Sequence, residues 1–396
     1  MRHVLRAARL FDGRTPDILE RGWVLLDDGR IVAVEHGATD PPPGVEVTDL
    51  GDVTLMPGLI DAHVHLGFDA SQDPVARMRV DSDATLLLRM RHAAQRALAA
   101  GITTVRDLGD RNYLGIALRD WFRNGPEAGP EIIAAGPPIT VTGGHCWFMG
   151  GEADGELEVR RSVRAHVKAG VDVLKVMATG GHMTHGTNPG LPQYTVGEIR
   201  AAVEEAHRLD RQVTAHAHGP TGISNVVEAG VDCIEHCSFR VGGSRQPDPH
   251  LIDAIASRGI FVSPTVGTLT PGGPLMESFV PILSDMHRAG VRLVASTDAG
   301  ISPAKPHDVL PRGIIFLTRA GLSNAQALMA ATSVAAEACG IDQRKGTLAP
   351  GKDADLLAVG GDPLRDTNAL LDVRAVYRGG VVVGTPLAPG SPLCSK

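Results

Sequence analysis

The chain has 396 residues, of which 43 % are hydrophobic, and its mean hydropathy lies near zero. These values are typical of a globular protein that buries a large core. The 38 Lys and Arg residues against 45 Asp and Glu give a net charge of −7, which is spread along the chain. This balance favours neither a nucleic acid nor an anionic membrane as a partner, and it leaves a homo-oligomer open.

The cysteines and the N-terminus indicate a reducing compartment. Cys146, Cys233, Cys237, Cys339 and Cys394 are scattered without a C-x-x-C pair, so they predict neither a disulfide framework nor a zinc ribbon. The opening stretch "MRHVLRAARLFDG" lacks the apolar region of a secretory signal, and no run approaches the ~20 apolar residues that span a bilayer. We therefore expect a cytoplasmic protein.

Both ends of the chain have the pattern of antiparallel strands. Residues 1–56 contain short alternating stretches such as "WVLLDD" and "RIVAVEHG", separated by Gly, Asp and Pro turns. Residues 344–396 repeat this pattern in "DADLLAVGG" and "AVYRGGVVVG". We expect the two ends to build one sheet together.

Residues 57–343 have a different pattern, in which short apolar runs alternate with segments whose hydrophobic residues have the spacing of a helix. The runs are "LIDAHVHLG", "GITTVRDLG", "EIIAAG", "VDVLKVMATGG", "RQVTAHAHG", "GVDCIEHCS", "GIFVSP" and "GVRLVASTDAG". Between them, segments such as "TVGEIRAAVEEAHRLD" indicate amphipathic helices. Eight β-then-α units predict a (β/α)₈ TIM barrel, and the absence of a G-x-G-x-x-G turn disfavours a doubly wound open sheet.

The runs of this predicted barrel end in side chains that bind metals. His63 and His65 lie two positions apart on one strand and so share a face. An isolated H-x-H is more often a pair of buried histidines bonded to backbone carbonyls. Here the pattern recurs at the ends of the fourth, fifth, sixth and eighth runs, in Lys175, His216, His218, His236 and Asp298.

A closed barrel brings its strand ends to a common centre, so these side chains predict a metal site. Imidazole with carboxylate is a typical ligand mixture for zinc, which is the default, although manganese, cobalt or iron can occupy similar sites.

The motifs "MPGLIDAHVHLG", "STDAG" and "KGTLAPGKDADLLAVGGDP" make the chain resemble the amidohydrolase superfamily over its whole length. The resemblance is to the binuclear members, with H-x-H after strand one, lysine on strand four, histidines on strands five and six, and aspartate on strand eight. It implies a barrel over residues 57–343, flanked by a small β-sandwich domain built from residues 1–56 and 344–396.

This resemblance also implies a ligand for each metal. The implied ligands are His63, His65 and Asp298 for one ion, His216 and His236 for the other, and Lys175 between the two. Burial and nearby positive charge lower a lysine pKa from ~10.4, and the neutral amine can then capture carbon dioxide. Carboxylated Lys175 would be an anionic ligand for both metals, whereas the alternative is a lysine paired with an acid such as Asp298.

A hydroxide that bridges two such ions is nucleophilic at neutral pH, because metals lower the pKa of water to ~7. Its attack on an amide carbonyl, with Asp298 carrying the proton to the departing nitrogen, would give a carboxylate and an amine. The stretches "TGGH", "LKVMATGG", "AHAHG" and "IEHCS" resemble those of Xaa-Pro dipeptidases and N-acyl amino acid hydrolases, including ochratoxin-degrading enzymes. We therefore expect a metal-dependent amidase or dipeptidase acting on a small molecule with an amide bond next to a carboxylate.

Several further residues are candidates for contacts around the metals. Asp61 shares the face of His63 and His65, where we expect it beneath the metals, orienting a ligand imidazole. His218 faces the same way as His216, so the residues alone do not decide which of the two is the strand-five ligand. Matching the family's motif assigns His216, and we expect His218 to contact substrate or support the ligands. Arg106 would either anchor a carboxylate or neutralise the surroundings of Asp107.

The stretches "TVTGGHCWFMGG" and "ATGGHMTHGTNPGLPQY" look like active-site loops. His145, in the first, would donate to the substrate carbonyl or carboxylate, because prolidase-type relatives have a histidine in this loop; bracing of the loop is the alternative. His182, His185 and Tyr194, in the second, are weaker candidates for substrate contacts, and loop structure is their alternative.

Three other functions compete with amide hydrolysis. Deaminases of the superfamily commonly have a glutamate three residues after the strand-five histidine and no bridging lysine, whereas this chain has Gly219 and Lys175. A lactonase or phosphotriesterase stays open, because the same hydroxide attacks other electrophiles. A scaffold that had lost catalysis would lack ligands, but all six matching positions are filled.

Overall fold

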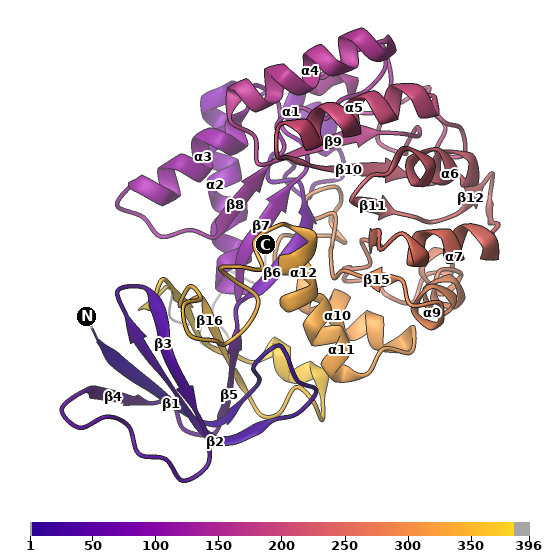
Figure 1. Cartoon of the computed structure of the whole chain (residues 1–396). Coiled ribbons are helices and arrows are strands. Elements are labelled where there is room, and N and C mark those ends of the chain that lie inside the picture. The colour runs from indigo at the N-terminus through magenta and orange to yellow at the C-terminus, as the bar shows by residue number, and fades with distance from the viewer. Residues whose placement is uncertain (1, 384–396) are drawn as a thin grey trace.

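The computed structural model describes residues 2–383, and within them both ends of the chain enter one eight-stranded sheet (Figure 1). Its strands are β1 (His3–Leu10), β2 (Leu19–Asp27), β3 (Arg30–Glu35), β4 (Glu46–Asp49), β5 (Val53–Pro57), β16 (Leu356–Gly360), β17 (Val373–Arg378) and β18 (Val381–Val382). The expectation that the two ends build one sheet is confirmed. The two-layered sandwich and the domain boundaries stay predictions, and residues 384–396 of the last domain lie outside the described residues.

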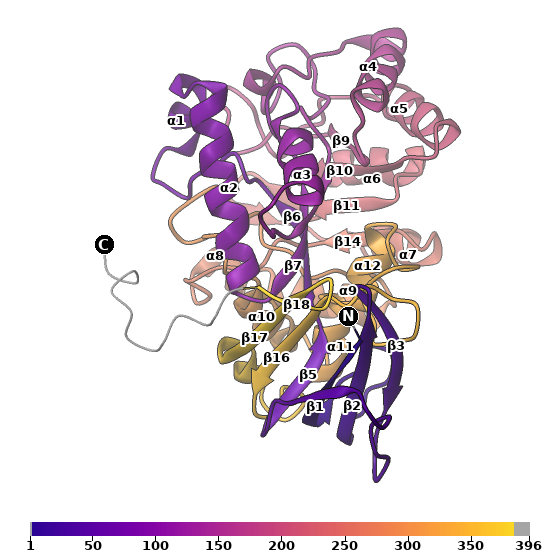
Figure 2. The same ribbon diagram turned by 90° about the vertical axis from the view of Figure 1, so that its left-hand side faces the viewer.

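Strand β5 joins the two ends of the chain. It runs parallel to β1, where Arg9 lies opposite Thr54, and antiparallel to β16, where Pro57 lies opposite Leu356. The apolar side chains of this sheet form a core of their own, which includes Leu55 and Leu356. Figure 2 shows the sheet at one end of the molecule, with β5 running up into the rest of the chain.

The middle of the chain supplies a three-stranded and a five-stranded parallel sheet. Their strands are β6 (Leu59–Val64), β7 (Ile102–Asp107), β8 (Glu131–Ala134), β9 (Val173–Met177), β10 (Gln212–Ala217), β11 (Cys233–His236), β14 (Phe261–Ser263) and β15 (Arg292–Leu293). All eight coincide with the predicted runs. Two short strands after β11, β12 (Arg240–Val241) and β13 (Ser244–Arg245), form a separate hairpin.

Backbone hydrogen bonds connect the outer edges of the two parallel sheets. At one edge the Asp298 N–H donates to the His63 carbonyl at 2.8 Å, which brings the segment after β15 against β6. At the other edge the Ile139 N–H donates to the Lys175 carbonyl at 2.8 Å. These bonds place the carboxyl ends of β6, β9 and β15 around a common centre.

Helices alternate with these strands and cover them from outside (Figures 1 and 2). They are α1 (Pro74–Val80), α2 (Asp83–Ala99), α3 (Leu114–Asn124), α4 (Gly155–Ala169), α5 (Val196–Arg208), α6 (Pro220–Ala229), α7 (Pro249–Ser257), α8 (Pro274–Glu277), α9 (Val280–Arg288), α10 (Leu310–Arg319), α11 (Asn324–Ala330) and α12 (Ser333–Ala338), with 3₁₀ turns η1 (Trp147–Met149) and η2 (Thr367–Leu371). A capping box of Thr195 and Glu198 begins α5, the helix predicted from its apolar period. No helix among the described residues combines the length and apolarity needed to cross a membrane.

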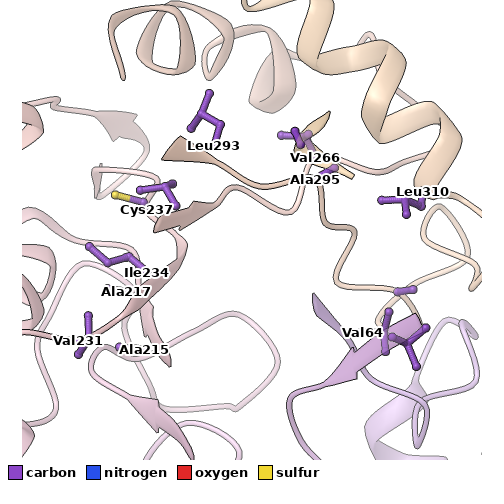
Figure 3. Packing of buried hydrophobic residues seen from close by; sticks show 14 of the residues in the cluster. Val64, Ala215, Ala217, Val231, Ile234, Cys237, Val266, Leu293, Ala295 and Leu310 are labelled. Atoms are coloured by element: carbon purple, nitrogen blue, oxygen red, sulfur yellow. The ribbon is translucent and has the colours of Figure 1, made fainter. Parts of the chain in front are cut away.

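Strand alternation separates the core from the polar centre. Ala215 and Ala217 of β10 and Ile234 of β11 belong to the large hydrophobic core shared with the helices (Figure 3). Successive side chains of a strand point to opposite faces, so His216 faces away from that core. The carboxyl ends of the strands therefore carry their polar side chains toward the centre.

Candidate metal centre

Three candidate ligand atoms, from the carboxyl end of β6 and from the segment after β15, lie close together. The Nε2 atoms of His63 and His65 lie 3.3 Å apart, and each lies 3.4 Å from Oδ1 of Asp298. Ligand atoms around a tetrahedral zinc ion are about 3.3 Å apart, given Zn–N distances of ~2.0–2.1 Å. Burial opposes ionisation of Asp298, but His63 and His65 outweigh it and hold the pKa of this carboxyl below its usual range.

A second group lies beside the first. The ring nitrogens of His216, His218 and His236 come within 4.8 Å of one another, and His63, His236 and Asp298 satisfy the same criterion. His236 belongs to both groups, so the two are adjacent. Burial lowers the pKa of His216, His218 and His236, which keeps these rings neutral at pH 7, the state in which imidazole binds metals.

Hydrogen bonds orient the rings. The Nδ1 atoms of His63, His65 and His236 pair with Glu235, the Gly109 carbonyl and the Thr265 hydroxyl, at 2.6, 3.3 and 2.9 Å. Each of these bonds leaves Nε2 available as a metal ligand. His216 differs, because its Nε2 lies 3.0 Å from the Gly180 carbonyl. Its Nδ1 is therefore the nitrogen available as a metal ligand.

Left-handed backbone turns direct two of the candidate ligands. Alternation along β11 would place His236 on the face of Ile234, but His236 has φ of 68° and its ring lies 4.6 Å from that of His216. Asp298 has φ of 60°. A residue other than glycine in this region costs about 1–3 kcal/mol, and such strain gathers at functional sites.

Lys175 is a buried amine without a partner. Its side chain, on β9, is 1 % exposed, and within residues 2–383 its ammonium has neither a hydrogen-bond acceptor nor a carboxylate within ion-pair distance. Burial lowers its pKa, with help from Arg106, against the opposing charges of Glu235 and Asp298. An unpaired buried ammonium is costly, so this environment favours the neutral amine and fits a carboxylated lysine. The alternative of an ion pair with Asp298 is not realised.

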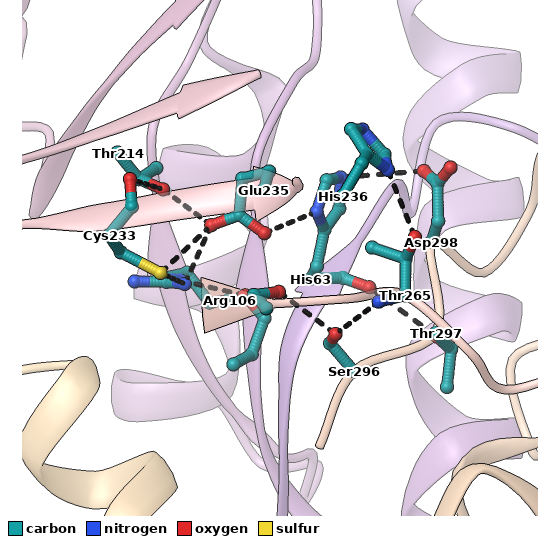
Figure 4. Close-up of polar contacts among 12 residues, drawn as sticks. His63, Arg106, Thr214, Cys233, Glu235, His236, Thr265, Ser296, Thr297 and Asp298 are labelled. Atoms are coloured by element: carbon teal, nitrogen blue, oxygen red, sulfur yellow. Dashed lines mark hydrogen bonds and ion pairs between the residues drawn. The ribbon is translucent and has the colours of Figure 1, made fainter. Parts of the chain in front are cut away.

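Glu235 is the main residue that the sequence analysis missed (Figure 4). Its Oε2 lies 2.6 Å from Nδ1 of His63, and its Oε1 accepts hydrogen bonds from Arg106, at 2.9 Å, and from the Thr214 hydroxyl. Burial alone would raise its pKa, but His63 and Arg106 hold that pKa well below the usual range. The sequence feature that could have identified Glu235 as a residue of the site is its position, as an acid, inside the apolar run "CIEHC".

The structure corrects the role expected for Asp61. Its carboxylate accepts bonds from the Thr297 hydroxyl at 2.6 Å and from the backbone N–H groups of Thr297 and His63 at 3.2 Å. Among residues 2–383 no imidazole forms a hydrogen bond with it, so the expectation that it orients a ligand ring is wrong, and Glu235 orients His63 instead. Burial raises the pKa of Asp61 to about 7.

Arg106 anchors a carboxylate, as one of its two expected roles has it, but that carboxylate belongs to Glu235 and not to a substrate. Arg106 is buried, donates to the Ala62 carbonyl at 2.7 Å, and pairs with Glu235 rather than with Asp107. Both bonds hold the guanidinium inside the protein, where a substrate carboxylate does not reach it.

Two of the loop histidines lie against the cluster. The ring of His145 is 4.8 Å from that of His216, and its Nδ1 lies 3.1 Å from the Thr184 hydroxyl. Burial, with Lys175, lowers the pKa of His145 to about 3. The ring centroid of His182 lies 5.7 Å from that of His218, and Nε2 of His182 accepts a hydrogen bond from Arg240 at 2.6 Å.

The structure does not bring His185 and Tyr194 to the cluster. The Tyr194 hydroxyl donates to the Ala153 carbonyl at 2.6 Å, and its side chain is 2 % exposed within the large hydrophobic core. His185 is exposed, and no contact of its side chain ties it to the ligands. Both placements fit the alternative of loop structure.

Comparisons with known proteins find one matching family and several similar proteins. The family model described as "Amidohydrolase family" matches residues 54–383. Ochratoxinase of Aspergillus niger is 29 % identical over 376 residues, covering 84 % of this chain and 76 % of that protein. Imidazolonepropionase of Rhizorhabdus wittichii is 28 % identical over 393 residues, covering 89 % and 91 %. The crystal structure of a Xaa-Pro dipeptidase with methionine bound in its active site superimposes with a TM-score of 0.88 at 28 % identity, covering 97 % of this chain and 100 % of that one.

Proposed function

Because the chain belongs to the amidohydrolase family and is a hydrolase acting on C–N bonds, we propose that it cleaves an amide bond in a small substrate such as a dipeptide or an N-acyl amino acid. The observation that carries this proposal is Lys175, a buried amine that has no partner among residues 2–383 and lies beside two groups of candidate metal-binding side chains. Carboxylation would give this amine the negative charge that a pair of cations requires.

The resemblance to the family assigns the residues that would hold the ions, and the short distances within the two histidine groups support that assignment. His63, His65 and Asp298 would bind one ion, His216 and His236 the other, and carboxylated Lys175 both. Zinc is our first choice for this set of ligands. Two divalent ions, when bound, supply Lewis-acid polarisation of a carbonyl oxygen and acidification of water.

Asp298 would move the proton. Its Oδ1 faces His63 and His65, whereas its Oδ2 has no hydrogen-bond partner among residues 2–383. The depressed pKa keeps the carboxylate ionised at neutral pH, so it starts the reaction as a base. It can take a proton from the attacking water and deliver it to the departing nitrogen.

His145 and Arg240 would select the substrate. His145, neutral at pH 7, lies beside His216 and could donate a hydrogen bond to the substrate carbonyl. Arg240 lies next to His182 and His218, and within the described residues no carboxylate forms an ion pair with it. An unpaired guanidinium is suited to a substrate carboxylate, and a free amino acid occupies the active site of the similar Xaa-Pro dipeptidase.

The experiment is a hydrolysis screen of dipeptides and N-acyl amino acids, each with a free and an amidated C-terminus, with metal content measured on the same preparation. We expect two metal ions per chain and a preference for free carboxylates. Arg240→Gln should raise KM about tenfold for the free acids and leave the amidated substrates unchanged, because one charge-assisted hydrogen bond is worth roughly 1.5–3 kcal/mol. Activity confined to the amines of nucleobases, with one metal per chain, would overturn the proposal.

A further inference from the structure

The ammonium of Lys305 binds two backbone carbonyls next to residues of the candidate metal centre. Lys305 follows β15, and its Nζ donates to the Thr265 carbonyl at 2.7 Å and to the Thr297 carbonyl at 2.6 Å. Within residues 2–383 no carboxylate lies within ion-pair distance of it. Its two hydrogen bonds thus connect the turn after β14 with the turn after β15.

Both turns contain left-handed residues. Thr265 has φ of 56°, and the Thr297 carbonyl belongs to the peptide that enters Asp298, whose φ is 60°. Turns of this kind leave strand pairing, so their carbonyls need other donors. Lys305 supplies a donor to both, and the Ser296 hydroxyl supports the same region by accepting a bond from the Thr265 N–H at 2.9 Å.

Each turn also positions one ligand (Figure 4). The Thr265 hydroxyl pairs with Nδ1 of His236 at 2.9 Å, and Asp298 itself places its Oδ1 between His63 and His65. A change of backbone angle at either turn would therefore displace a metal ligand. His236 and Asp298 lie together in one of the two candidate ligand groups.

We infer that Lys305 is a positioning residue, whose ammonium ties the Thr265 and Thr297 carbonyls together and thereby fixes the spacing of His236 and Asp298. The inference rests on the metal centre of the proposed function. Within residues 2–383 the Lys305 side chain forms no hydrogen bond or ion pair with a candidate ligand side chain, so it acts through the two turns.

The test measures metal binding rather than hydrolysis. Metal-free protein is titrated with Co²⁺, and the visible spectrum of the bound ion is recorded. Lys305→Met removes both donors, and we expect affinity for Co²⁺ to fall about 10–100-fold, as for other residues that orient metal ligands, with a changed spectrum. Lys305→Arg, which keeps N–H donors at this position, should restore most of the affinity and the wild-type spectrum.

Lys352→Met is the matched control. Lys352 also donates to a backbone carbonyl, that of Asp342, but it lies beside the terminal sheet, where its own carbonyl accepts from Ile31. We expect this variant to bind Co²⁺ with the wild-type affinity and spectrum.

The outcomes separate this inference from the proposed function. Wild-type affinity and spectrum in Lys305→Met would overturn the inference alone, while a wild-type protein that binds no Co²⁺ would overturn the metal centre and the inference with it. If Lys305→Met does not fold, Lys305→Gln is tested in its place. A lower affinity for Co²⁺ than that of the arginine variant supports the inference. Wild-type affinity for Co²⁺ refutes it.

Discussion

Nδ1 of His63 lies 2.6 Å from Oε2 of Glu235, and the other oxygen of that carboxylate accepts from Arg106 at 2.9 Å. Three strands, β6, β11 and β7, are joined by this buried series of charges. The carboxylate requires a proton on Nδ1, so the lone pair of His63 lies on Nε2, the atom that faces Asp298.

Glu235→Gln should therefore weaken metal binding about 10–100-fold, measured by competition with a chelator. It also leaves the Arg106 charge unpaired, so urea unfolding of the metal-free protein should show a loss of about 3–5 kcal/mol. Glu228→Gln is the control, because Glu228 is an exposed residue of α6 that pairs with Arg200. Unchanged metal affinity with reduced stability would confine Glu235 to the ion pair with Arg106.

Lys175→Ala should abolish both metal retention and hydrolysis, because it removes the ligand proposed to serve both ions. Small carboxylates such as formate or propionate should restore part of the activity by filling the vacated space with an anion. Metal content and kcat, measured with and without the added acid, check this result. Full activity of the variant without any added acid would remove the carboxylated lysine from the mechanism.

Tyr194→Phe should leave kcat/KM within about twofold of the wild-type value and lower the free energy of unfolding by about 1 kcal/mol. The variant loses the hydrogen bond from the hydroxyl to the Ala153 carbonyl but keeps the buried ring. Kinetics and urea denaturation on one preparation measure both quantities. A tenfold loss of kcat/KM at unchanged stability would show that Tyr194 contacts substrate after all.

Glu131 should make stability depend on pH. Burial raises its pKa, but Arg344, Lys345 and Arg378 outweigh this and lower it from 4.5 to about 2. The pKa is lower in the folded state, so the contribution to stability is complete above about pH 4.5 and disappears as the pH falls through about 2. At roughly 1.4 kcal/mol per pKa unit, the contribution of Glu131 to the free energy of unfolding is on the order of 3 kcal/mol.

The measurement compares the unfolding free energies of wild type and Glu131→Gln, both metal-free, between pH 7 and pH 3. The difference should be largest at pH 7 and should shrink below pH 4.5. A difference that does not change over this range would exclude Glu131 as the source. Metal-free protein is used because acid also protonates the histidine ligands.

Periodicity was sufficient to predict the parallel strands and the shared terminal sheet, because alternation and helical spacing are local properties. Each of the eight runs became a strand in chain order. The convergence of the candidate ligand side chains was also predictable, since a residue at a strand end approaches the centre whatever its partners are. The left-handed φ of His236 was not predictable, because nothing in "IEHCS" distinguishes His236 from a regular strand residue.

Partnerships between distant residues were harder to predict. Asp61 and Glu235 are both acids in apolar runs, and position alone favoured Asp61 because it shares a face with His63. The Asp61 carboxylate instead binds the turn at Thr297, while Glu235 reaches His63 from another strand. Lys305 was missed for the same reason, because its acceptors are backbone carbonyls that leave no mark in the sequence.

The pairing of Pro57 with Leu356 has a consequence for how the molecule is made. A ribosome releases the chain from its N-terminus, so one side of β5 stays unpaired until β16 has emerged, after most of the polypeptide has been synthesised. An exposed strand side of this kind invites association with other chains. Premature termination before residue 356 would therefore produce a fragment prone to aggregation, because it lacks the strand β16 that covers this side of β5.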